Sequence, residues 1–213
     1  MISEQIASFG IVPVVRIERA GDAVPLAEAL WAGGIRVVEF TFRTEAAGEA
    51  IRNSVEKLPE MLVGAGTVRS VAQFEEAMDA GARFVVTPGF NRKVVETAVR
   101  EHVPIYPGIV TPGELERVLE YGIKTVKFFP AEASGGTATL KAFAGPYGDV
   151  NFIPTGGIGP ENFEQYLGLG NVLAVGGSWL TKGDDSGRLD YRLIERRAAE
   201  AMERVAALRG RAE

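Results

Sequence analysis

The chain of 213 residues contains no cysteine and a single histidine, His102. The absence of cysteine excludes a disulfide framework, a thiolate nucleophile and a cysteine metal site. His102 lies where a helical pattern gives way to a strand, and we expect it to have a structural role on the surface. Paired histidines and carboxylate clusters with ligand spacing are also missing, so we expect no catalytic metal.

Long apolar runs and clustered positive charge are equally scarce. No run is long enough to span a bilayer, and the opening residues MISEQIASFG lack the cationic and apolar regions of a signal peptide. The formal net charge is -5, whereas nucleic acids and anionic membranes bind basic surfaces. We therefore expect a cytoplasmic protein that binds neither nucleic acid nor membrane. A small anionic substrate needs only a local cluster of positive charge.

Short apolar runs alternate with helical patterns along the whole chain. Eight of these runs are candidate strands, at residues 11–17, 36–42, 61–67, 83–88, 103–109, 124–130, 151–157 and 172–178. Most are apolar on both faces, which is typical of a parallel sheet covered by helices. The number favours a closed (β/α)8 TIM barrel. The alternative is a doubly wound open sheet, but the glycine-rich turn that binds dinucleotides after its first strand is missing.

The helices between these runs have recognisable ends. Thr111, Pro112 and Glu114 predict a capping box with a first-turn proline, and Ser70 with Gln73 predicts a second capping box. We expect one α/β domain over residues 1–213, with a short N-terminal helix before the barrel and a C-terminal helix over residues 192–213.

Charged residues occur near the ends of two predicted strands, where a barrel places its active site. In RVVEFTFRT, Glu39 and Arg43 share strand parity, so we expect both to point into the barrel mouth. In KTVKFFP, Lys127 lies near the end of its strand, whereas Lys124 has the opposite parity at the beginning. A buried lysine tends to lose its proton and become a nucleophile. The alternatives are a structural ion pair and an exposed lysine at the strand edge.

Paired glycines end the last two predicted strands, in PTGGIGPENF and VGGSWL. In barrels these two loops often bind an anion through backbone N–H groups. Gly156, Gly157, Gly176 and Gly177 permit close approach, and Ser178 adds a hydroxyl group. We expect a phosphate site here, although a glycine pair alone is also typical of a simple turn.

The strand ends resemble those of the 2-keto-3-deoxy-6-phosphogluconate (KDPG) aldolases in the motifs VVEFTFRT, VGAGTV, FVVTPGF, YPGIVTP, VKFFPAEASGG, PTGGI and GGSWL. These are class I aldolases related to 4-hydroxy-2-oxoglutarate (KHG) aldolase. The resemblance extends in order from Val12 to Leu180. It implies a homotrimeric (β/α)8 barrel that uses no cofactor and cleaves the phosphorylated keto acid to pyruvate and glyceraldehyde 3-phosphate.

The resemblance also implies a role for each residue at the strand ends. Lys127 would form the Schiff base, Glu39 would be the general acid and base, and Arg43 would bind the substrate carboxylate. The remaining positions would line the pyruvate pocket (Thr67, Pro88 and Phe129) or hold the phosphate (Gly156, Gly157 and Ser178).

Other functions use parts of the same set. A 4-hydroxy-2-oxoglutarate aldolase needs Lys127 and Glu39 but no phosphate site, and the galactonate-derived epimer of the substrate differs only in stereochemistry at C4. A non-catalytic sugar-phosphate-binding barrel leaves Glu39, Arg43 and Lys127 unexplained. A phosphosugar isomerase or epimerase needs a carboxylate base but no buried lysine.

Overall fold

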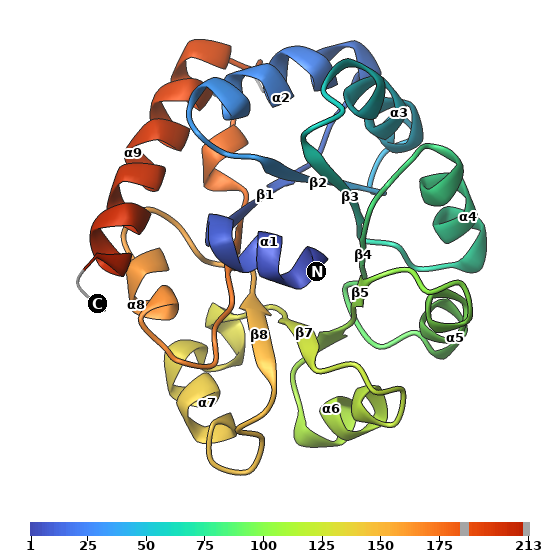
Figure 1. Ribbon diagram of the computed structural model, residues 1–213, viewed down its shortest axis with the longest axis vertical. Helices are drawn as coiled ribbons and strands as arrows, with labels where there is room; N and C mark the ends of the chain where they lie inside the picture. Colours follow the sequence, from blue (N-terminus) through green and yellow to red (C-terminus); the bar gives the residue numbers. More distant parts are fainter. Residues whose placement is uncertain (184–187, 211–213) are drawn as a thin grey trace.

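The computed structural model, which describes residues 1–183 and 188–210, alternates parallel strands with helices (Figure 1). The strands are β1 (Ile11–Val15), β2 (Val37–Thr41), β3 (Leu62–Gly66), β4 (Val85–Val86), β5 (Ile105–Tyr106), β6 (Gly108–Ile109), β7 (Thr125–Phe128), β8 (Asn151–Pro154) and β9 (Val175–Gly177). Each predicted run contains at least one of these strands, so the eight strand predictions are confirmed, although most runs extend one to several residues beyond the strands that they contain.

The helices are α1 (Ile2–Phe9), α2 (Ala23–Ala32), α3 (Ala47–Lys57), α4 (Val71–Asp79), α5 (Arg92–Arg100), α6 (Pro112–Leu119), α7 (Gly136–Phe143), α8 (Phe163–Leu167) and α9 (Tyr191–Arg209). In the described residues they are joined by short 3-10 helices, η1 (Ala20–Asp22), η2 (Glu132–Ser134) and η3 (Trp179–Thr181). The predicted N-terminal and C-terminal helices are confirmed as α1 and α9, and the predicted residues 211–213 of the latter lie outside the described residues.

The strands form a curled parallel sheet in two hydrogen-bonded parts. One part has six strands in the order β5-β4-β3-β2-β1-β9, and the other has three in the order β6-β7-β8. Pro107, which has no N–H group, separates β5 from β6, and its carbonyl accepts a hydrogen bond from Lys127 N at 2.9 Å. Single bridges pair Phe152 with Val172 and Thr155 with Gly176. The predicted α/β class with a parallel sheet is confirmed.

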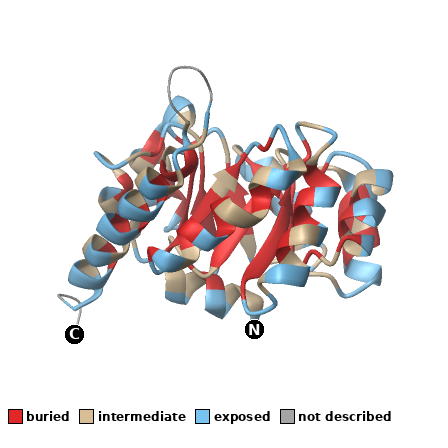
Figure 2. Ribbon diagram, turned by 90° about the horizontal axis from the view of Figure 1, so that it is seen from above, coloured by how far each residue is buried: buried red, intermediate tan, exposed pale blue. Residues whose placement is uncertain are grey.

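Helices surround the strands on the outside, and α1 lies across the middle of the ring (Figure 1). Burial is concentrated on the strands and on the inner faces of the helices, while the outer faces are exposed (Figure 2). The α1 residue Ile6 is fully buried, so this helix closes the interior at the end where the strands begin. No helix in the described part of the chain is long and apolar enough to cross a membrane.

Side-chain hydrogen bonds cap the two helices, α4 and α6, for which the sequence predicted capping boxes. The hydroxyl of Thr111 accepts a hydrogen bond from Glu114 N, and the Glu114 carboxylate accepts one from Thr111 N, which completes the capping box of α6. Ser70 caps α4 in the same way by accepting from Gln73 N. The Gln73 side chain, however, accepts from Arg69 N instead of closing the second box on Ser70.

Candidate active site

Lys127 and Glu39 meet inside the ring, although they come from strands in different parts of the sheet. Glu39 lies on β2 and is 3% exposed, and Lys127 lies on β7 and is 4% exposed. The distance from Lys127 Nζ to Glu39 Oε1 is 3.7 Å. The structure therefore brings together the two side chains that strand parity directed inward.

The pair borders a cavity of about 10 Å³, which is about the room that one water molecule needs. The other lining residues are mostly apolar: Ile6, Val12, Phe84, Val86, Tyr106, Ile153 and Thr155. Among the described residues, Oε1 of Glu39 has no hydrogen-bond partner. Burial raises the pKa of Glu39, and the nearby charge of Lys127 acts in the opposite direction. Glu39 consequently exchanges its proton at a higher pH than an exposed glutamate does.

The carboxyl group of Glu39 lies directly against the backbone of β3. A Cβ atom on Gly66 would overlap Glu39 Oε1, so only glycine leaves room for the carboxyl group at this position. Gly66 ends β3 and pairs with Thr41, two residues beyond Glu39 on the neighbouring strand. Sequence reasoning gave this glycine no role of its own, because the contact depends on the register between β2 and β3.

One of the three predicted pocket residues lies beside Lys127, and the other two directly follow β3 and β4. The Phe129 ring centre is 5.1 Å from Lys127 Nζ, within range of a cation–π contact. Thr67 follows β3 with a φ of 56°, a left-handed conformation that is unusual for a β-branched residue and that occurs mostly at functional sites. Pro88 follows β4 and is half-buried.

Arg43 is placed differently from the prediction. The strand β2 ends at Thr41, and Arg43 lies in the turn that follows, with its side chain exposed. Its backbone N donates a hydrogen bond to Thr41 O at 2.7 Å. Strand parity does not apply to Arg43, because the alternation of a strand does not continue through a turn, so its direction toward the barrel mouth stays a prediction.

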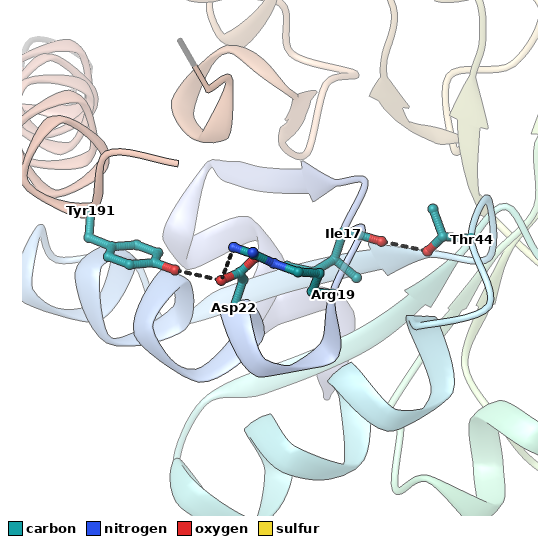
Figure 3. A network of polar contacts seen from close by, with 5 residues as sticks. All are labelled: Ile17, Arg19, Asp22, Thr44 and Tyr191. Carbon is teal, nitrogen blue, oxygen red and sulfur yellow. Dashed lines mark hydrogen bonds and ion pairs between the residues drawn. The ribbon is translucent and has the colours of Figure 1, made fainter. Parts of the chain in front are cut away.

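A network of polar contacts holds the loop after β2 in place (Figure 3). The hydroxyl of Thr44 donates a hydrogen bond to the carbonyl of Ile17 at 2.5 Å, which ties this loop to the one after β1. Asp22 accepts from Arg19 at 2.9 Å and from the Tyr191 hydroxyl at 3.1 Å. The two loops are thereby anchored to α9.

The predicted phosphate residues lie on neighbouring strand ends. Gly156 and Gly157 follow β8 with φ values of 99° and 78°, in the left-handed region that favours glycine. Ser178 follows β9 and is exposed, and the bridge between Thr155 and Gly176 sets the two ends side by side. Backbone N–H groups in such turns can bind an anion.

One cation at this edge was missed by sequence reasoning. Arg16 follows β1, whose Pro13 pairs with Gly177 of β9. It is half-exposed and forms an ion pair with Glu18 at 2.9 Å. Arg16 lies just beyond Val15, where β1 ends, so strand parity gave no signal that could have identified it.

The chemistry of the site follows from the pair. In residues 1–183 and 188–210 no group of three or more His, Asp or Glu side chains is arranged to hold a metal ion. A lysine amine in an apolar interior is a nucleophile toward carbonyl carbon, and a buried carboxyl group beside it can accept and return protons.

Proteins of similar sequence and proteins of similar structure point to the same family and the same fold. The family model described as KDPG and KHG aldolase matches residues 2–196. The KHG/KDPG aldolase of Escherichia coli K12 is 46% identical over 202 residues, which cover 94% of this chain and 95% of the relative.

Solved structures of two bacterial enzymes superpose closely. The KDPG aldolase of Legionella pneumophila, with pyruvate captured as a covalent carbinolamine intermediate, has a TM-score of 0.88 and 39% identity, and covers 93% of this chain and 97% of its own. The 2-keto-3-deoxy-6-phosphogluconate aldolase of Zymomonas mobilis with 3-phosphoglycerate has a TM-score of 0.88 and 38% identity, and covers 94% of both chains.

Burial of Glu39 predicts a pH-dependent stability once its partner is removed. The pKa of Glu39 in the folded protein is raised above 4.5, the value for an exposed glutamate. Between these two pKa values the folded protein binds more protons than the unfolded chain, so stability is lost as the pH rises from the lower value to the higher one. In Lys127→Met the opposing charge is gone and the window widens. We expect its free energy of unfolding to fall by up to about 1.4 kcal/mol per pH unit relative to Lys127→Met/Glu39→Gln.

Urea unfolding of both variants between about pH 5 and pH 8 measures this difference. The double variant is the control, since it differs only in lacking the titrating group. Parallel stability curves would show that Glu39 is not desolvated in the folded protein.

Proposed function

The chain belongs to the family of KDPG and KHG aldolases, and we infer that it is a class I aldolase that cleaves 2-dehydro-3-deoxy-6-phosphogluconate to pyruvate and D-glyceraldehyde 3-phosphate. The observation that carries this inference is the buried pair of Lys127 and Glu39, with 3.7 Å between Nζ and Oε1. An amine and a carboxyl group side by side are what Schiff-base chemistry requires.

We assign the role of nucleophile to Lys127. Its neutral amine adds to the C2 carbonyl of the substrate and forms a carbinolamine, which loses water to give an iminium. When the bond between C3 and C4 breaks, its electron pair moves toward the iminium nitrogen and an enamine forms. The iminium supplies this electron sink without a metal or other cofactor. The carbinolamine captured in the Legionella pneumophila aldolase supports the assignment.

Glu39 moves the protons that these steps require. It assists the loss of water from the carbinolamine, accepts the proton of the C4 hydroxyl as glyceraldehyde 3-phosphate leaves, and returns a proton to C3 of the enamine. Hydrolysis of the resulting iminium releases pyruvate and restores the amine. The raised pKa of Glu39 suits this exchange, because a group that both takes and gives a proton works best when its pKa lies near the working pH.

The keto acid end of the substrate is assigned to the residues around the pair. Arg43 has a planar guanidinium group that suits a carboxylate, and its exposed side chain is free to bind one. Thr67 and Pro88 line the pyruvate pocket, and the Phe129 ring covers Lys127. These assignments combine the roles that the family resemblance implies with the positions of the residues at the strand ends.

The phosphate end is assigned to Gly156, Gly157 and Ser178. The exposure of Gly157 and Ser178, the left-handed glycine turn and the pairing of the two strand ends support this assignment. Arg16 adds positive charge at the same edge. The Zymomonas mobilis structure, which contains a phosphorylated three-carbon acid, also supports it.

A second candidate activity is cleavage of 4-hydroxy-2-oxoglutarate to pyruvate and glyoxylate, because the family includes aldolases of both names. That reaction uses Lys127 and Glu39 in the same way and leaves the phosphate end empty. Assaying pyruvate release from 2-dehydro-3-deoxy-6-phosphogluconate, its galactonate-derived epimer and 4-hydroxy-2-oxoglutarate compares the three substrates directly.

We also propose that the two parts of the sheet form one closed (β/α)8 barrel. Pro107 interrupts what is otherwise a single fifth strand, and the bridges beside β8 and β9 link the parts on the other side. The family resemblance further supports a homotrimer located in the cytoplasm.

The lysine assignment predicts opposite results for two lysines of the same strand region. Lys127→Ala should lower kcat by about 10⁴-fold or more, because the covalent route is lost. Lys124 is exposed and pairs with Asp149 at 2.6 Å near the beginning of β7. Lys124→Ala should therefore keep kcat within about twofold, since surface substitutions are usually mild. A pyruvate-release assay measures both, and a Lys127→Ala enzyme with undiminished turnover would contradict the assignment.

The phosphate assignment predicts a change of substrate preference in Ser178→Asp. The introduced carboxylate would repel the substrate phosphate, and two like charges about 4 Å apart repel by roughly 1 to 4 kcal/mol at a protein surface. We expect kcat/KM for the phosphorylated substrate to fall at least about tenfold. With 4-hydroxy-2-oxoglutarate, which has no phosphate, it should change little. Equal losses on both substrates would show that Ser178 does not contact the phosphate.

A further inference from the structure

A tyrosine and a glutamate that the mechanism does not use lie beside the phosphate end. Tyr166 of α8 is 1% exposed, and its hydroxyl donates a hydrogen bond to Oε1 of Glu132. Glu132 begins η2, a few residues after Lys127 on β7. The hydrogen bond thus joins a buried side chain of α8 to the segment that follows the catalytic lysine.

Glu132 contacts both glycines of the turn after β8. Its backbone N donates a hydrogen bond to Gly156 O at 3.1 Å. A Cβ atom on Gly157 would lie 2.5 Å from Cγ of Glu132, so the Glu132 side chain lies directly against Gly157. The orientation of this one side chain therefore limits the conformations open to the double-glycine turn.

Gly136 lies against the hydrogen bond between Tyr166 and Glu132. A Cβ atom on Gly136 would lie 3.0 Å from the Tyr166 hydroxyl oxygen and 3.2 Å from Glu132 Oε1. Without this bond, the Glu132 carboxyl group would have a choice of rotamers at an exposed position. Some of them would point the negative charge toward the turn.

We propose that Tyr166 and Glu132 are positioning residues for the substrate phosphate. Their hydrogen bond holds the Glu132 side chain against Gly157, which fixes the left-handed turn whose N–H groups receive the phosphate, and keeps the carboxylate charge directed away from it. The inference rests on the proposed function, because it assigns a purpose to the phosphate end described above.

The tyrosine is a dependable donor in this arrangement. Burial, followed by the neighbouring Glu132 carboxylate, raises the pKa of Tyr166. Its hydroxyl therefore keeps its proton, and so remains a donor, at every pH at which an aldolase of this kind would work.

Tyr166→Phe tests the proposal by removing only the hydroxyl group. The KM for the phosphorylated substrate should rise about three- to tenfold, the effect of one lost hydrogen bond. Its kcat, and kcat/KM for 4-hydroxy-2-oxoglutarate, should stay within about twofold. Inorganic phosphate, used as a competitive inhibitor, should show a matching rise in its inhibition constant.

Substitutions of Glu132 give an independent reading of the same bond. Glu132→Gln keeps a carbonyl oxygen that can accept from Tyr166, so we expect nearly unchanged KM values. Glu132→Ala removes the acceptor and should reproduce the effect of Tyr166→Phe. This pair of variants keeps the proposal testable if Tyr166→Phe fails to fold.

Tyr147→Phe is a matched control. The Tyr147 hydroxyl donates a hydrogen bond to Glu116 at 3.0 Å, but this pair lies near the beginning of β8, away from the strand ends that carry the site. Loss of this hydroxyl should leave the KM values of both substrates within about twofold.

Two results would overturn the proposal. Equal losses on both substrates would make Tyr166 and Glu132 purely structural, and unchanged KM and inhibition constants would remove their role altogether. The result for Ser178→Asp distinguishes a failure of the positioning role from a failure of the phosphate assignment. If Ser178→Asp discriminates between the substrates and Tyr166→Phe does not, only the positioning role fails. If neither discriminates, the phosphate end itself is wrongly assigned.

Discussion

The amine of Lys127 and the carboxyl group of Glu39 lie 3.7 Å apart in an interior that excludes most water. Burying either group alone would cost several kcal/mol or force it to become neutral. The surrounding structure follows from this constraint. Gly66 leaves space for the carboxyl group, and Ile6 of α1 closes the cavity from the end where the strands begin. The proposed chemistry depends on the same constraint, because a lysine must lose its proton before it can attack a carbonyl carbon.

Parallel strands explain how one site can hold both ends of a long substrate. All strands of such a sheet end at the same edge, so groups far apart in the sequence become neighbours there. Lys127 and Glu39 are buried, Arg43 is exposed in the turn after β2, and the turns at Gly157 and Ser178 follow the neighbouring strands β8 and β9. The substrate would be held at its carboxylate and its phosphate, with C2 against the lysine between them.

The periodicity of apolar residues predicted the strands and the directions of side chains within them. It did not predict features that depend on contacts between residues far apart in the sequence. The strands and the inward direction of Glu39 and Lys127 follow from the alternation of apolar residues. Arg43 was assigned to the strand because nothing in the sequence marks the end of β2 at Thr41. The bond between Tyr166 and Glu132 joins residues 34 positions apart, so no local pattern announces it. The paired glycines at the ends of the last two strands indicated the phosphate site, whereas the identity of the substrate came from the resemblance of the strand-end motifs to a known family.

Borohydride reduction in the presence of pyruvate tests the central claim most directly, because it reduces an iminium to a stable amine at the residue that formed it. Peptide mass spectrometry of the treated protein should place one pyruvate-derived adduct on Lys127 and none on Lys124, which is exposed and bound to Asp149. An adduct on any other lysine, or no adduct at all, would contradict the account and leave the buried lysine as a structural residue.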